Sequence, residues 1–169
     1  MPFFVKALEK VKNIVYNEYI DGEIRYVLKL EVYCMLKLMI GVKGTGKTKT
    51  LIENVNNAAK TSKGNVVCIE KGPHLRFDIN SKVRLVDAEE YLISDAEALY
   101  GFVAGILASN YDVTDVFVDN TLKICGGNVA AMEAMLENVA ALLQKNDVNI
   151  FMTASMPAEE AGETLKKYL

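Results

Sequence analysis

Hydrophobic residues follow two alternating spacings along most of this chain. Short continuous apolar runs, typical of buried strands, precede segments in which apolar residues recur every three or four positions, typical of helices. The expected strands are 36–40, 66–69, 82–86, 113–118 and 148–152, and the expected helices are 47–60, 94–109 and 128–143. This alternation predicts a three-layer α/β fold with a mostly parallel sheet covered on both faces. A short last helix is expected near Glu159 and Glu160.

Two of these helices carry signals for their first residues. Ser94-Asp95-Ala96-Glu97 is a capping-box sequence with Ser94 as the cap, and Asn128 is the expected cap of the following helix. The methionines of that helix are interpreted as core filler and not as a groove.

The first thirty-four residues fit this plan less well. An amphipathic helix is predicted by four residues at helical spacing, Val5, Leu8, Val11 and Val15. A turn at 21–22 and an alternating strand at 24–32 follow, and this strand would continue without a turn into the strand at 36–40. Residues 30–32 can be encoded by a purine-rich sequence that resembles a bacterial ribosome-binding site. We therefore hypothesise that Met35 is the natural start, that 35–169 is the nucleotide-binding domain, and that 1–34 is an extension; an added edge strand or a partner-binding arm is the alternative.

A glycine-rich loop lies between the first strand of this domain and its first helix. It reads Gly41-Val42-Lys43-Gly44-Thr45-Gly46-Lys47-Thr48 and fits the P-loop pattern G-x-x-x-x-G-K-[ST] at every fixed position. Glycines allow main-chain N–H groups to converge on phosphate oxygens, Lys47 suits the β- and γ-phosphates, and Thr48 offers a hard oxygen ligand to Mg²⁺. We therefore expect residues 41–48, with Lys49 in the first helical turn, to bind the phosphates of a nucleoside triphosphate.

A second candidate is the acid that follows the apolar run 113–118. Asp119 is placed as the carboxylate of a Walker B strand, on the metal side of the site and available to Mg²⁺. A turn aspartate at a strand end is the alternative reading. Asp112 and Asp115 are weaker candidates because they precede or interrupt the run. The next residue, Asn120, cannot act as a base.

The stretch from Leu36 to about Ser155 resembles the ATP-binding core of RecA-like P-loop NTPases. The chain is also similar to short bacterial ATP-binding proteins labelled after the twitching-motility pilus-retraction ATPase, although it lacks the length and the histidine motifs of the motors. The resemblance implies that Glu70, at the end of its strand, activates the attacking water. It also implies that Thr153 or Ser155 contacts the γ-phosphate. The alternative for Glu70 is that it solvates the end of its strand, and the alternative for Thr153 or Ser155 is that it caps a helix.

Composition and charge limit the kinds of partner and cellular location that are expected for this chain. The 169 residues are 51% hydrophobic with a net charge of −3 and a pI near 5.3, so the overall charge does not point to a nucleic-acid or membrane surface, and a local basic patch is left open. No run reaches the roughly eighteen apolar residues of a membrane span. The three cysteines are isolated in or beside apolar runs, as in reduced core thiols, and a cytoplasmic protein is expected. His74 is interpreted as a loop residue near the site. Arg76 and Arg84 are the only arginines after residue 34, so an arginine finger would come from one of them, from another subunit, or not at all.

The leading hypothesis is an ATP-binding protein with Mg²⁺-dependent, slow or partner-stimulated ATP hydrolysis. Lys47, Glu70 and Asp119 are its catalytic residues, and Thr48 and Asp119 are its metal residues. ATP is favoured because no N-K-x-D motif occurs and no D-x-x-G follows the loop, both of which GTPases would require. A nucleotide-dependent switch and a small-molecule kinase are the alternatives. Partners could include a homo-oligomer or an unidentified protein.

Overall fold

The computed structural model describes residues 11–20, 23–32 and 36–169. The chain divides into two compact units, Met1–Cys34 and Met35–Leu169. In the described part of the smaller unit, β1 (Val11–Ile20) pairs antiparallel with β2 (Glu23–Val32), and Ile20 lies opposite Glu23.

Two expectations for the smaller unit are wrong. Val11 and Val15 belong to strand β1 and not to a helix, because β1 pairs with β2 along its whole length and valine has a high strand propensity. Strand β2 does not continue into the next strand: β2 ends at Val32, and the two strands belong to different sheets. Val5, Leu8 and the expected turn at 21–22 lie outside the described residues.

The larger unit is built on a five-stranded sheet in which every neighbouring pair is parallel. Its strand order is β3-β7-β6-β4-β5. The strands are β3 (Leu36–Gly41), β4 (Asn65–Glu70), β5 (Arg84–Asp87), β6 (Val113–Val118) and β7 (Asn149–Ser155). The α/β class and the parallel sheet are therefore confirmed. All five carboxyl ends lie along one edge of the sheet, which is where ligands bind in open sheets of this kind.

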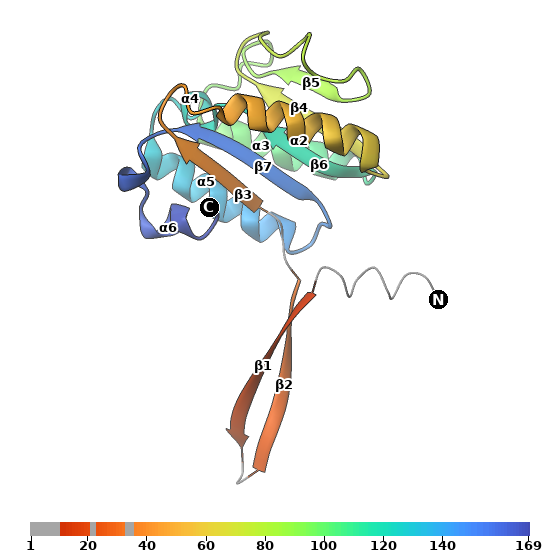
Figure 1. The fold of residues 1–169 in the computed structure, drawn as a ribbon, viewed down its shortest axis with the longest axis vertical. Helices are drawn as coiled ribbons and strands as arrows, with labels where there is room; N and C mark the ends of the chain where they lie inside the picture. The colour runs from red at the N-terminus through yellow and green to blue at the C-terminus, as the bar shows by residue number, and fades with distance from the viewer. Residues whose placement is uncertain (1–10, 21–22, 33–35) are drawn as a thin grey trace. The chain divides into compact units, whose positions relative to one another are not determined.

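Helices cover both faces of the sheet (Figure 1). Helix α2 (Lys47–Thr61) lies on one face, where it contacts β3, β4, β6 and β7. Helices α3 (Ala96–Ser109) and α5 (Val129–Leu143) pack against each other on the opposite face. The short elements are α4 (Thr121–Ile124), the 3-10 helix η1 (Ala158–Glu160) and α6 (Glu163–Lys166).

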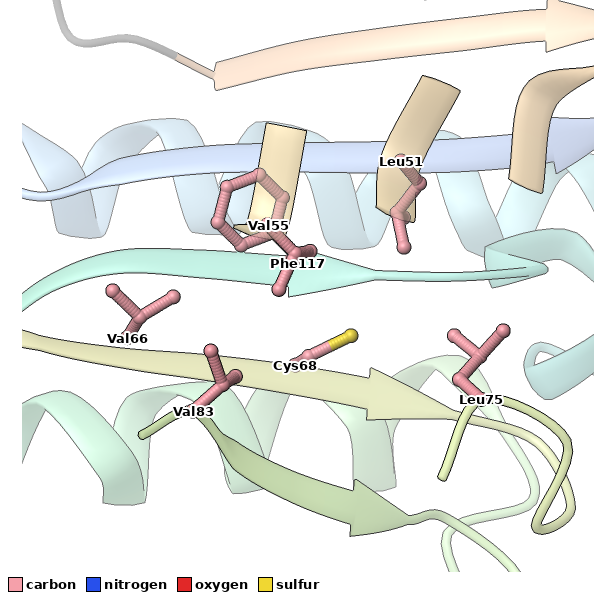
Figure 2. Packing of buried hydrophobic residues seen from close by; sticks show 7 residues of the cluster. All are labelled: Leu51, Val55, Val66, Cys68, Leu75, Val83 and Phe117. Carbon is pink, nitrogen blue, oxygen red and sulfur yellow. The ribbon is translucent and has the colours of Figure 1, made fainter. Parts of the chain in front are cut away.

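The core beneath α2 holds that helix, and the loop before it, against the sheet. Figure 2 shows Leu51 and Val55 of α2 close to Phe117 of β6, with Val66 and Cys68 of β4 and Leu75 and Val83 of the segment between β4 and β5 beside them. Both α2 residues are fully buried. Complete burial of one such side chain stabilises the fold by roughly 1.5–3 kcal/mol. The first turn of α2 is thus fixed relative to the ends of β4 and β6.

The helix caps were predicted almost correctly. Asn128 caps α5, where its side chain accepts a hydrogen bond from Ala131 N at 3.0 Å. The capping-box prediction was off by one residue: Asp95 and not Ser94 caps α3, accepting from Ala98 N at 2.7 Å. An aspartate is as good a cap as a serine, so the sequence allowed either start.

Candidate functional site

The glycine loop, residues 41–48, joins the end of β3 to the start of α2. Gly44 and Gly46 have φ angles of 90° and 85°, in the left-handed region that favours glycine. Gly41 is needed for a different reason, because a Cβ there would lie 2.8 Å from Thr45 Oγ1. The backbone of this loop therefore depends on the glycines that the sequence places in it.

The N-terminus of α2 points its free donors into this loop. The first N–H groups of a helix have no partner within it, and α2 has no side-chain cap and no acidic residue in its first turn. The positive end of the helix dipole therefore faces the loop without a negative group to balance it. Such an end favours an anion. Val42, Lys43, Gly44, Thr45 and Gly46 are all exposed, so an anion could reach it from solvent.

Lys47 places a buried ammonium group inside the loop. The residue is only 6% exposed, and its Nζ donates to Gly41 O at 2.7 Å and to Val42 O at 2.8 Å, with Thr45 Oγ1 at 3.4 Å. All three acceptors are uncharged. Within the described residues, Lys47 forms no salt bridge. A buried cation that is balanced only by dipoles is costly, and an anion placed beside it would relieve that cost.

Asp119 lies directly after β6 and faces the first turn of α2. Thr48 Oγ1 is 3.4 Å from both carboxylate oxygens of Asp119. Asp119 is 4% exposed and also accepts from Thr153 Oγ1 at 2.7 Å and from Asn120 Nδ2 at 3.0 Å. The two residues that the sequence predicts as metal ligands are thus brought together. A threonine hydroxyl and a carboxylate are hard oxygen donors of the kind that Mg²⁺ takes.

A metal ion here would need further ligands. Among the described residues, no three His, Cys, Asp or Glu side chains cluster closely enough to hold a metal ion. Mg²⁺ is normally held by one or two protein oxygens, with waters and substrate phosphates completing its shell. Thr48 and Asp119 fit that mode of binding and not a dedicated protein cage.

Thr153 lies on β7, between β3 and β6 in the sheet, and is 1% exposed. Its hydroxyl accepts from Asn120 N at 3.0 Å and donates to Asp119 Oδ1 at 2.7 Å. Since a hydroxyl has one proton to donate, none is left for a phosphate while this arrangement holds. Ser155, the other candidate for the same role, is exposed at the end of β7.

Glu70 is the last residue of β4 and is almost fully buried. Its Oε2 accepts from two backbone N–H groups of the following loop, His74 N at 2.9 Å and Leu75 N at 2.8 Å. Burial raises the pKa of Glu70 above its ordinary value of 4.5, although these two hydrogen bonds oppose the shift. The carboxylate is thus held on the loop that follows β4, and no hydrogen bond joins it to the described residues of the glycine loop or to Asp119.

The remaining candidates lie apart from this cluster. Arg84 begins β5 opposite Val67, away from the carboxyl edge, and donates to Tyr91 OH at 3.2 Å. Arg76 is exposed in the loop after β4. Asp115 accepts from Ser62 Oγ at 2.5 Å and from Asn149 Nδ2 at 2.9 Å, which is a structural role within the sheet and its connections.

Sequence reasoning missed two features of the site. Helix α4 is not among the expected helices, and Asn120 at its start was considered as a residue that cannot act as a base. The second feature is the bridge that joins the ends of β3 and β7, in which Met156 N donates to Gly41 O at 3.1 Å. The sequence Asp-Asn-Thr could have indicated the first, because asparagine is common where a chain turns into a helix.

A hollow of about 400 Å³ lies elsewhere in the larger unit. It is bounded by the amino-terminal parts of β4 and β5 and by one side of α3, with Arg84, Tyr91 and Phe102 in its lining. Arg84 is the sequence candidate that lines it; the glycine loop, Glu70, Asp119 and Thr153 do not. The glycine loop is an open, solvent-facing surface and not part of this hollow.

Comparison with known proteins adds no family to these observations. A scan against models of protein families finds no match, and a search of curated proteins finds no significant similarity. Within the described residues, no helix has both the length and the apolar character that a membrane crossing requires.

Proposed function

We propose that this chain is a P-loop protein that binds ATP together with Mg²⁺ and hydrolyses it slowly. The observation that carries the proposal is the buried ammonium of Lys47, which has no counter-ion within the described chain and lies at the uncapped N-terminus of α2. A polyphosphate would supply the missing negative charge to both. The preference for ATP over GTP rests on the absence of guanine-reading motifs from the sequence.

The residues would divide the work in the following way. Main-chain N–H groups of the glycine loop and the first turn of α2 would hold the phosphates, and Lys47 would leave Gly41 O and Val42 O to neutralise their charge. Thr48 and Asp119 would hold Mg²⁺, which supplies Lewis-acid polarisation of the phosphate oxygens when bound. Thr48 Oγ1 lies 3.4 Å from both carboxylate oxygens of Asp119, so the two residues already lie together beside the loop.

Slow turnover follows because neither Glu70 nor Asn120 is placed to act as a base. The Glu70 carboxylate is engaged with two backbone N–H groups, and Asn120 cannot accept a proton from water. Glu70 would have to release its loop before it could orient an attacking water. This favours a second candidate function, a nucleotide-dependent switch in which bound ATP persists and changes the surface offered to a partner.

Calorimetric titration with ATP, with and without Mg²⁺, tests the proposal. Removal of one charge-assisted set of hydrogen bonds costs about 1.5–3 kcal/mol, so Lys47→Ala should weaken Mg²⁺·ATP binding by roughly 10- to 100-fold. Lys60→Ala is the matched control, since Lys60 is an exposed lysine at the other end of the same helix. No uptake of ATP by the folded wild-type protein, or equal affinity of the Lys47→Ala variant, would overturn the proposal.

Single-turnover measurements separate the two candidate functions. An ATPase should release phosphate from a bound stoichiometric amount of ATP, and Glu70→Gln should slow that release if Glu70 orients water. A switch should bind ATP tightly without cleaving it, and Glu70→Gln should then have no effect on the nucleotide.

A further inference from the structure

Asn120 has an unusual backbone conformation at the edge of the candidate site. Its φ and ψ angles are 54° and 42°, in the left-handed helical region. Leu92 is the other non-glycine residue with a positive φ in the described chain, and it lies in an exposed turn. Asparagine tolerates this region better than most residues, but holding it there still requires support from its surroundings.

That support comes from the two neighbouring side chains of the site. The Asn120 main-chain N–H donates to Thr153 Oγ1 at 3.0 Å, and its side-chain Nδ2 donates back to Asp119 Oδ2, also at 3.0 Å. Thr153 in turn donates to Asp119 Oδ1 at 2.7 Å. Each carboxylate oxygen therefore receives a donor, one directly from Asn120 and one through the hydroxyl that Asn120 orients.

These two hydrogen bonds, from Asn120 and from Thr153, fix the orientation of the Asp119 carboxylate. With one donor on each oxygen, the carboxylate cannot rotate without losing a hydrogen bond, and Thr48 Oγ1 is left equally distant from both oxygens. In this left-handed conformation the Asn120 amide reaches back to the residue that precedes it. With a right-handed backbone at position 120, the side chain would leave the backbone in a different direction.

We infer that Asn120 is a positioning residue that holds the Asp119 carboxylate toward Thr48 for Mg²⁺ binding. This inference rests on the proposed function. It also explains why an amide stands next to the metal-side acid: the position is used to orient the acid and not to activate water. Partners that orient a metal ligand typically contribute 10- to 100-fold to metal affinity.

Two variants remove the amide and differ in their backbone preference. Asn120→Gly keeps the main-chain N–H bond to Thr153 and accepts a positive φ without strain, so it should fold normally. Asn120→Ala also lacks the amide but is strained at this φ, so it should be less stable. Leu92→Gly is the matched control, because it introduces the same residue at the other left-handed position, away from the site.

The experiment measures binding of a non-hydrolysable ATP analogue as Mg²⁺ is titrated, and again in excess EDTA. We expect Asn120→Gly and Asn120→Ala to raise the half-saturating Mg²⁺ concentration by about tenfold, with affinity in EDTA unchanged and with Leu92→Gly behaving as wild type. Wild-type Mg²⁺ dependence in both Asn120 variants would overturn the inference while the proposed function stands. Failure of the wild-type protein to bind the analogue at all would overturn the proposed function, and the inference with it.

Discussion

Replacing Thr153 by valine tests whether the hydroxyl network of the site also stabilises the fold. Valine has nearly the same shape as threonine and no hydroxyl, so Thr153→Val removes hydrogen bonds without opening a cavity. Two losses follow: the donation to Asp119 Oδ1 at 2.7 Å, and the acceptor for Asn120 N. A hydrogen bond to a charged group contributes about 1.5–3 kcal/mol, and a buried N–H left without a partner costs about 1–3 kcal/mol.

The two losses are coupled through one oxygen atom, so they should not add fully. We expect Thr153→Val to lower the free energy of unfolding by about 3 kcal/mol. Thr153→Ser keeps the hydroxyl and removes one buried methyl group, which should cost only about 1 kcal/mol. The order of the two variants is therefore the reverse of what loss of packing alone predicts.

Urea denaturation followed by circular dichroism at a helical wavelength would measure both variants, since all helices in the described residues belong to the larger unit. The difference in midpoint, at equal slope, gives the difference in stability. If Thr153→Ser proved as destabilising as Thr153→Val, the hydrogen bonds of this hydroxyl would contribute nothing beyond the packing of its methyl group, and the network would have been misjudged.

Three further predictions follow. Burial raises the pKa of Glu70 above 4.5, so folding favours the protonated form of this side chain. The stability of the wild-type protein relative to Glu70→Gln should therefore fall as the pH rises above 4.5 through the folded-state pKa. Denaturation curves that show a constant difference between the two proteins from pH 4 to 8 would refute this. Asn120→Glu should not accelerate ATP hydrolysis, because the left-handed backbone directs the side chain toward Asp119; faster phosphate release than wild type would show that position 120 can hold a base. Burial raises the pKa of the Cys125 thiol to about 11 and raises that of Cys68 further. After iodoacetamide treatment at pH 8, peptide mass spectrometry should therefore find both thiols unmodified in the native protein and modified in urea. Labelling of either thiol in the native protein would contradict its burial.

The sheet and its main helices could be predicted from sequence because their signals are local. Short segments rich in apolar residues marked all five strands of the larger unit, and the capping residues Asn128 and Asp95 lay at or next to the expected positions. The last strand was expected to end at Met152 and continues to Ser155, because pairing with β3 extends it to Ser155 opposite Gly41. That pairing is a long-range contact that no local pattern encodes.

The smaller unit shows the limit of the same reasoning. Val11 and Val15 have spacing compatible with a helix, but cross-strand pairing with β2 decides their conformation. Periodicity over a few residues cannot distinguish the two outcomes when the residues are β-branched.

At the candidate site, the sequence predicted which residues would be present but not which hydrogen bonds they would form. The pattern from Gly41 to Thr48 indicated which side chains would gather at the loop, and Asp119 was found from its position after an apolar strand. That Glu70 binds the loop following it could not be read from the chain, since it depends on how residues 71–75 fold back. Hydrogen-bond partners are set by tertiary structure, so residue types alone do not predict them.

The strand order explains why Asp119 reaches Thr48 although their supporting strands are not neighbours. Strand β7 lies between β3 and β6, so the backbones of β3 and β6 are separated by two strand spacings, roughly 10 Å. Thr48 crosses part of this distance because it belongs to the first turn of α2, a helix that contacts β7 and β6 as well as β3. Thr153 of the intervening strand β7 is buried and donates a hydrogen bond to Asp119 Oδ1 at 2.7 Å. A side chain at 153 without a hydroxyl would release the carboxylate from this bond, so the intervening strand supplies the contact that holds Asp119 near Thr48.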